Sequence, residues 1–202
     1  MRISKQEREY YNSWDTYESD LRDDGWRVPR QLVNNIKHFL RGGEMILDVG
    51  CGTGLVGVEL QKIGWAGCLV GIDISERRIN EAVKKNIYRA CFHMDADHLG
   101  FPNEKFDVIL ASALVGITGP RSVLEMRRVL KTSGLIGCAV GELKHVSGGS
   151  KRFKSSISCF DKLSDMRKVN FKDLGTGYSG KRNDEHYILY ILRHTAKTKQ
   201  NA

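Results

Sequence analysis

Residues 46–54 read Ile46-Leu47-Asp48-Val49-Gly50-Cys51-Gly52-Thr53-Gly54, and this stretch decides the fold. Its apolar first half is typical of a buried β-strand. An acid, Asp48, lies at the end of this half, and three glycines follow at every second position. Because glycine has no Cβ, the chain can turn tightly after the strand and approach a ligand closely. We therefore expect a strand, a ligand-binding turn and a helix, the first unit of an alternating α/β fold.

The spacing of the glycines does not identify the ligand by itself. Residues 52–57 satisfy G-x-G-x-x-G, the pattern of dinucleotide-binding turns. A pyrophosphate bound at this turn would be repelled by Asp48, whereas a ligand that carries an ammonium and a sulfonium, such as S-adenosylmethionine (SAM), would be attracted. Alternatively, Asp48 caps backbone amides of its own turn, and the two roles can coexist.

A second acid supports a nucleoside ligand. Asp73 follows the apolar run Leu69–Ile72 and lies 19 residues after Gly54. This is close to the interval of about 20 residues expected for a ribose-binding carboxylate at the end of the second strand. The alternative is that Asp73 only precedes a helix whose N-cap is Ser75. We favour ribose binding, because the first motif already sets the interval.

Three later motifs extend the pattern, and their order is similar to that of the class I SAM-dependent methyltransferases. They are Asp95-Ala96-Asp97, Lys105-Phe106-Asp107-Val108-Ile109 and Met126-Arg127-Arg128-Val129-Leu130-Lys131. The resemblance covers residues 46 to about 141, and the length and aromatic N-terminal segment look most like the Williams-Beuren-type methyltransferase-like proteins. It implies SAM as cofactor and S-adenosylhomocysteine (SAH) as product.

The resemblance also assigns roles to residues. It implies that Asp48 and Gly50 flank the methionine part of SAM, Asp73 and Ile74 the ribose and adenine, and Asp95 the adenine amino edge. Cofactor and acceptor would meet just past the fourth strand. The predicted cofactor-binding residues are Asp48, Gly50, Cys51, Gly52, Gly54, Asp73, Ile74, Asp95, Ala96, Ala111, Tyr11, Trp14 and Tyr17.

Alternating apolar and amphipathic segments predict a three-layer αβα Rossmann-like fold with a seven-stranded, mostly parallel sheet and an antiparallel last strand. Strands are expected near 45–49, 68–72, 91–94, 106–111 and 135–140, with a closing hairpin over 168–174 and 186–192. Helices are expected near 29–40, 54–63, 76–89, 120–131 and 155–165.

The N-terminal segment predicts a helix that continues from Lys5 through Tyr17. Tyr10, Trp14 and Tyr17 would share one face, at positions i, i+4 and i+7. Such a stripe is more often core packing than a binding surface. In the resembled family, however, an N-terminal aromatic helix closes over the cofactor, and aromatic faces suit a sulfonium cation. We therefore expect Tyr11, Trp14 and Tyr17 to form a lid.

Length and composition indicate one domain. A chain of 202 residues with 41% hydrophobic content can bury a substantial core. We expect a helical lid over 1–43, a cofactor-binding core over 44–143, a substrate-side helix and hairpin over 144–195, and a disordered tail over 196–202. The five scattered cysteines and the missing signal-peptide pattern favour a cytoplasmic protein. The apolar runs are too short for a membrane span. We expect a monomer or a homodimer.

Charge is distributed unevenly along the chain. Residues 1–143 contain 19 Lys and Arg and 19 Asp and Glu, whereas residues 144–202 contain 13 and 5, which accounts for the whole net charge of +8. Such an excess could attract an anionic acceptor or nucleic acid, or could serve solubility alone. Few aromatic residues are interspersed for base stacking, so we favour a small or anionic molecule over nucleic acid.

Methyl transfer from a sulfonium needs alignment of donor and acceptor, and a base only where the acceptor must lose a proton. The best base candidates are Glu142 and His145, which follow the fifth strand. The chain lacks the Asn/Asp-Pro-Pro-aromatic motif of exocyclic-amine enzymes and a Pro-Cys nucleophile. Asp107 alone does not make the metal site of catechol-type enzymes, so no metal is expected.

These observations predict a SAM-dependent methyltransferase that acts on N or O of a small metabolite. Two alternatives stay open: a catalytically silent SAM-binding partner subunit, and an RNA or protein methyltransferase that uses the basic C-terminal segment. An NADP oxidoreductase would fit the glycine spacing, but Asp48 and the missing Tyr-x-x-x-Lys pattern argue against it.

Overall fold

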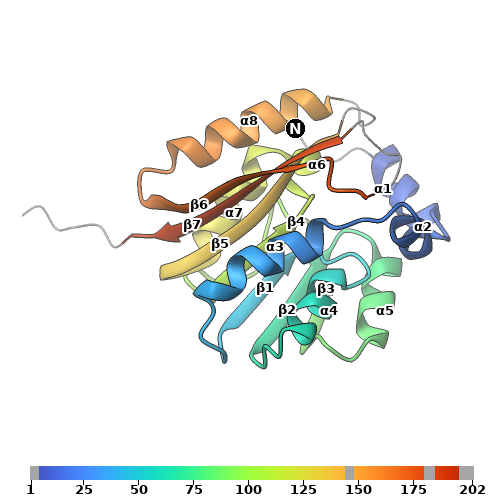
Figure 1. Ribbon diagram of the computed structural model, residues 1–202, viewed down its shortest axis with the longest axis horizontal. Helices are drawn as coiled ribbons and strands as arrows, with labels where there is room; N and C mark the ends of the chain where they lie inside the picture. The colour runs from blue at the N-terminus through green and yellow to red at the C-terminus, as the bar shows by residue number, and fades with distance from the viewer. Residues whose placement is uncertain (1–4, 144–147, 180–184, 196–202) are drawn as a thin grey trace, which may run out of the picture.

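The fold is built on one twisted sheet with helices on both faces (Figure 1). A computed structural model describes residues 5–143, 148–179 and 185–195. The strands lie in the order β3-β2-β1-β4-β5-β7-β6. Their bounds are β1 Met45–Val49, β2 Cys68–Asp73, β3 Ala90–His93, β4 Phe106–Ser112, β5 Leu130–Leu143, β6 Met166–Gly175 and β7 Glu185–His194.

Strands β1 to β5 pair in parallel, while β7 pairs antiparallel with both β5 and β6. The predicted Rossmann-like architecture, with an antiparallel last strand, is therefore confirmed. Because β7 runs against its neighbours, its first residue lies at the edge where the parallel strands end, and Glu185 pairs with Leu143 at the end of β5. That edge is where open α/β sheets bind ligands.

The helices divide between the two faces of the sheet. Helices α3 and α4 pack on one face with α5 beside them, and α6, α7 and α8 cover the other (Figure 1). Their bounds are α1 Lys5–Ser13, α2 Tyr17–Asp23, α3 Val28–Ile36, α4 Leu55–Lys62, α5 Glu76–Lys84, α6 Val115–Thr118, α7 Pro120–Val129 and α8 Gly149–Lys162, with a 3-10 turn at Lys37–Phe39.

Alternating residues of each strand supply the two cores. Ile46 of β1 packs into the core beneath α3 and α4, and the next residue, Leu47, packs into the core beneath α7 and α8. The same alternation places Val108 on the first side and Ile109 on the second, because successive side chains of a strand point to opposite faces. Both faces of the central strands are therefore buried.

The N-terminal segment differs from the prediction of one continuous helix. It forms two short helices, α1 and α2, separated by residues 14–16. Arg78 of α5 donates to the carbonyls of Tyr11 and Trp14. In an unbroken helix those carbonyls would accept from the amides of Asp15 and Glu18. Here they accept from the Arg78 guanidinium, beside the break between α1 and α2.

Two further expectations need comment. Helix α6 is absent from the prediction, because its four residues lie inside an apolar run without a helical repeat. The tail expected over 196–202 lies outside the described residues, as does His145. None of the helices in the described ranges is long and apolar enough to span a bilayer.

Candidate active site

The glycine turn follows β1 and leads into α4. The amides of Gly50 and Cys51 donate to the carbonyl of Ile72, at 2.8 and 2.9 Å, which ties the turn to the end of β2. Gly50 has φ +73°, and a Cβ there would lie 2.9 Å from a methyl carbon of Leu114. Gly54 has φ +91°, which glycine adopts without a steric cost. The alternating glycines are thus required by the backbone as well as by any ligand.

A cavity of about 320 Å³ opens beside this turn, at the carboxyl edge of the parallel strands. Ligand pockets begin at about this size. Its wall combines the glycine turn, the ends of β2 and β4, the N-terminal segment and the start of β7. The lining residues are Tyr10, Tyr11, Trp14, Tyr17, Leu21, Trp26, Gly50, Gly52, Asp73, Ile74, Arg78, Ser112, Ala113, Leu114, Ile117, Leu143, Tyr178, Glu185 and Tyr187.

Asp73 reaches the wall as the last residue of β2. Its two carboxylate oxygens accept from the amides of Gly52, at 2.9 Å, and Ser75, at 2.8 Å. Burial raises the pKa of this carboxyl, and the two amides and the nearby Arg78 guanidinium oppose that effect. A carboxylate has about four acceptor sites, so Asp73 can accept hydroxyl donors from a ligand while it holds the turn.

Asp48 lies behind the turn and is not among the residues that line the cavity. Its side chain is fully buried, and Tyr88 donates its hydroxyl to Oδ2 at 2.6 Å. Burial raises the pKa of Asp48 to about 7, while the Tyr88 hydrogen bond acts to lower it. The structure therefore gives Asp48 the role of a support beneath the glycine turn, and a direct contact with the methionine part of a cofactor stays a prediction.

The aromatic N-terminal residues lie on the cavity wall. Tyr10 and Trp14 have ring centroids 5.6 Å apart, and Trp14 and Tyr17 5.0 Å apart. The first ring pair is tilted and the second is T-shaped, so the three aromatic side chains form one cluster although the helix beneath them is broken. With Tyr11 they line the cavity, and their role as a lid stays a prediction.

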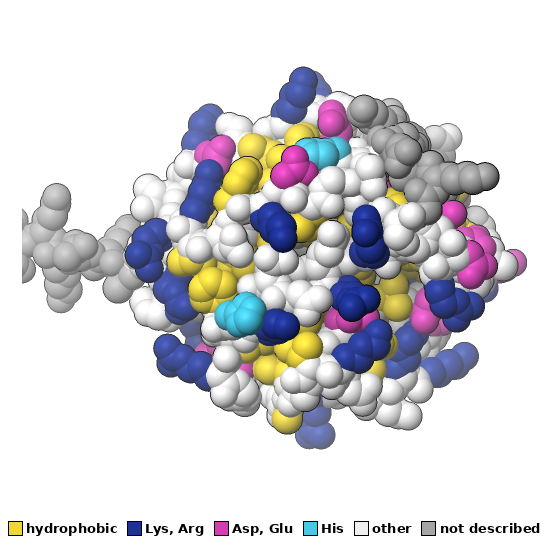
Figure 2. Space-filling model, in the orientation of Figure 1, with side chains coloured by type: hydrophobic (Ala, Val, Ile, Leu, Met, Phe, Trp, Pro, Cys, Tyr) yellow, Lys and Arg dark blue, Asp and Glu magenta, His cyan; other side chains and the backbone are white. Residues whose placement is uncertain are grey.

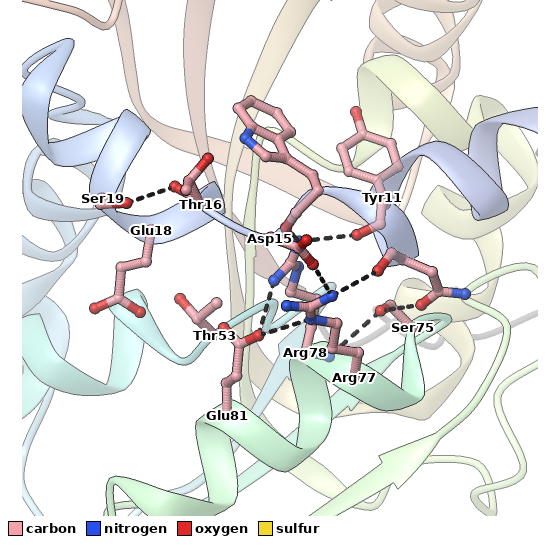
Figure 3. Close-up of polar contacts among 12 residues, drawn as sticks. Tyr11, Asp15, Thr16, Glu18, Ser19, Thr53, Ser75, Arg77, Arg78 and Glu81 are labelled. Atoms are coloured by element: carbon pink, nitrogen blue, oxygen red, sulfur yellow. Dashed lines mark hydrogen bonds and ion pairs between the residues drawn. The ribbon is translucent and has the colours of Figure 1, made fainter.

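A polar contact network joins this N-terminal segment to α5 (Figure 3). The Arg78 guanidinium bonds the carbonyls of Tyr11 and Trp14, pairs with Glu81 at 2.8 Å, and lies 4.5 Å from the ring centroid of Tyr17. Arg77 pairs with Asp15. Since Arg78 is only 3% exposed, these bonds form largely out of water, where they are strongest.

A second link holds the glycine turn. Lys85 donates from Nζ to Glu18 of α2, at 2.7 Å, and to the carbonyl of Thr53, at 2.8 Å. One ammonium therefore connects the N-terminal segment with the turn. A displacement of α2 would therefore strain the hydrogen bond between Lys85 and the carbonyl of Thr53, in the turn that borders the cavity.

Several predicted residues do not reach the wall. Ala111 is buried in β4, one residue before Ser112, which does line the cavity. Asp95 accepts from the amide of Asp97 at 3.0 Å and so stabilises its own loop. The remaining predicted cofactor residues that are absent from the wall are Cys51, Gly54 and Ala96. Their cofactor contacts stay predictions.

Of the two predicted bases, Glu142 does not line the cavity. It lies opposite His186 in the β5–β7 ladder, and its neighbour Leu143 lines the cavity, because successive residues of a strand face opposite sides. His145 lies outside the described residues. Within the ranges described, no group of three His, Cys, Asp or Glu residues is placed to hold a metal ion.

Sequence reasoning missed the far wall of the cavity. Trp26, Tyr178 and Tyr187 form an aromatic cluster there, and Glu185 lies beside them. Trp26 and Tyr178 come together through an isolated β-bridge between segments about 150 residues apart in the chain. No local pattern signals such a pairing, and the strand expected over 186–192 begins one residue after Glu185.

Comparison with known proteins agrees with this geometry. Residues 46–134 match a family described as a methyltransferase domain. An uncharacterized methyltransferase of Schizosaccharomyces pombe is 27% identical over 94% of this chain and 72% of its own length. Human methyltransferase-like protein 27 is 30% identical to this chain. The match covers 65% of this chain and 56% of that protein.

Among solved structures, the methyltransferase bound to the Trm112 methyltransferase activator of Haloferax volcanii is similar in fold. The TM-score is 0.71, and the similarity covers 94% of this chain and 97% of that one. The sequence identity is 15%, so this likeness concerns the fold.

Proposed function

Because the chain belongs to the class I SAM-dependent methyltransferases, we propose that it transfers a methyl group from SAM to N or O of a small molecule held in the main cavity. The observation that carries this proposal is the continuity of the cavity. The glycine turn and Asp73, where the cofactor would bind, line the same cavity as the aromatic cluster of Trp26, Tyr178 and Tyr187, where an acceptor would bind. The aromatic residues of the N-terminal segment line this cavity too, which supports a small acceptor over a macromolecule.

The residues present fit the cofactor. Asp73 offers acceptors for ribose hydroxyls, and Gly50 and Gly52 present backbone without side chains. Ser112 Oγ is buried on the cavity wall and has no protein partner among the described residues, so a ligand can satisfy it. When bound, SAM supplies an activated methyl group and its own leaving group, and the protein aligns and encloses the reactants.

Binding and transfer are tested separately. Calorimetry with SAM, SAH and NADP should show binding of the first two, and dinucleotide binding without SAM binding would overturn the cofactor assignment. Transfer of tritium from methyl-labelled SAM to a metabolite extract then tests the reaction. SAM binding without transfer to any small molecule would favour the silent partner subunit instead.

A second candidate is methylation of RNA or protein in a complex. It is favoured by the likeness to a methyltransferase that was solved with the Trm112 activator and by the C-terminal excess of Lys and Arg. On the face seen in Figure 2, however, Lys and Arg side chains are distributed rather than gathered into one patch. An RNA affinity that falls steeply with salt would support this candidate, and a flat response would count against it.

A further inference from the structure

The far wall of the cavity is aromatic and carries a carboxylate. The ring centroid of Trp26 lies 4.7 Å from that of Tyr178 and 5.2 Å from that of Tyr187. Glu185 faces the same space from the start of β7 and is only 4% exposed. Aromatic faces and a carboxylate share one property, which is attraction for a cation.

Glu185 is held in position by the cluster itself. The Tyr187 hydroxyl donates to Glu185 Oε2 at 2.5 Å, from the same face of the strand. Burial, together with the Glu185 carboxylate, raises the pKa of Tyr187 well above its ordinary value, so the phenol stays protonated and keeps donating. A buried carboxylate costs free energy unless a positive or hydrogen-bonding partner compensates it, and a cationic ligand would add such compensation.

The rings are fixed by close backbone packing. A Cβ on Gly141 would lie 2.5 Å from Tyr187, and one on Gly177 would lie 2.8 Å from the same ring. Arg27 donates its amide to the carbonyl of Gly177 at 2.8 Å and its guanidinium to the carbonyl of Tyr178 at 2.5 Å. The aromatic wall is therefore preorganised and does not need a ligand to assemble it.

The other charged groups on the described cavity wall strengthen the argument. They are Asp73 and Arg78. Arg78 is already engaged by Glu81 and two backbone carbonyls, so its charge is largely compensated. None of the described Lys and Arg residues of the basic C-terminal segment lines this cavity. Among the described residues that line the cavity, the carboxylates of Asp73 and Glu185 therefore outnumber the single guanidinium.

We infer that the methyl acceptor is a small amine, cationic at neutral pH, whose ammonium binds between the Trp26, Tyr178 and Tyr187 rings and the Glu185 carboxylate. This inference rests on the proposed function and differs from the anionic acceptor that was one interpretation of the basic C-terminal segment. Glu185 accepts a proton from the ammonium and leaves a neutral amine. The nitrogen lone pair then forms the N–CH₃ bond, the S–CH₃ bond breaks with its electrons on sulfur, and SAH and a methylated ammonium result. The Glu185 proton passes to water on product release.

Binding to the SAH-loaded protein tests the inference with defined probes. The probes share a phenylalkyl frame: phenethylamine and its N-methyl derivative are cationic, 2-phenylethanol is neutral and phenylacetate is anionic. Calorimetry should show that the amines bind at least 10-fold more tightly than the alcohol and the acid. Tighter binding of phenylacetate or of the alcohol, or no binding of either amine, would overturn the inference.

Glu185→Gln removes the negative charge and keeps the hydrogen bond, because the amide oxygen can still accept from the Tyr187 hydroxyl. We expect this variant to lose about 10- to 100-fold in amine affinity, as for a hydrogen bond to a charged group, and to bind 2-phenylethanol as the wild type does. Glu59→Gln on α4, away from the cavity, is the matched control with unchanged affinities. Equal amine affinity in wild type and Glu185→Gln contradicts the assignment.

SAM affinity separates the two proposals. Unchanged SAM binding in Glu185→Gln together with lost amine binding supports the acceptor site. Failure of the wild type to bind SAM would overturn the proposed function itself. Normal SAM binding with transfer to alcohols or acids, and none to amines, would leave the methyltransferase activity standing and refute the amine acceptor.

Discussion

Replacing Asp48 by Asn should stabilise the protein at neutral and alkaline pH. The pKa of this buried carboxyl rises from 3.8 to about 7 in the folded state. Because Asp48 binds its proton more tightly in the folded state than in the unfolded state, the wild-type protein loses stability as pH rises from 3.8 to about 7. Asn has the same shape, can accept the Tyr88 hydroxyl, and carries no charge to bury.

The magnitude follows from the two pKa values. Their difference, from 3.8 to about 7, corresponds to about 4 kcal/mol at about 1.36 kcal/mol per pH unit. Near pH 3.5 both side chains are neutral, so the variant and the wild type should have similar free energies of unfolding. At pH 8 the variant should be more stable by a value of about this order.

Urea denaturation at several values between pH 3.5 and 8, for wild type and variant, measures this difference. Asp107→Asn is a control for which the change in stability with pH should have the opposite sign, because the pKa of Asp107 is lowered in the folded state. Although burial raises its pKa, hydrogen bonds from Lys131 and from the amide of Met45 lower it overall, so its contribution to stability is present at neutral pH and lost on acidification. A difference between Asp48→Asn and wild type that does not change with pH would refute the reasoning.

Three further predictions follow from the site. Asp73→Asn should weaken SAM binding by about 10- to 100-fold, because a charged acceptor is lost, and an unchanged calorimetric affinity would remove Asp73 from the ribose site. Arg78→Met should free the N-terminal segment from α5, so amide exchange in residues 5–24 should accelerate relative to β1 and β4, and equal protection would contradict the role of the network. Gly116→Ala should destabilise the fold by about 1–3 kcal/mol or more, since its Cβ would lie 1.9 Å from the carbonyl oxygen of Gly141, and an unaltered melting temperature would show that α6 adjusts.

The sequence by itself predicted the sheet, and it singled out the glycine turn and Asp73, which the structure brings to one cavity. Strand β1, the glycine turn and Asp73 lie in short contiguous motifs, whose alternation and spacing follow from backbone geometry alone. The predicted seven-stranded, mostly parallel sheet with an antiparallel last strand was confirmed for the same reason. Local rules suffice where the residues that act together are neighbours in the chain.

The tertiary structure alone decided the rest. It shows a broken N-terminal helix, and Arg78, more than 60 residues away, donates to two carbonyls beside the break. It also shows Asp48 behind the turn, where Tyr88 from the loop between α5 and β3 donates to it. It also brought Trp26 against Tyr178 and placed Glu185 beside them, although these residues share no local motif. Contacts between distant segments form only when the sheet is assembled, so the acceptor side of the cavity could not be predicted from periodicity or spacing.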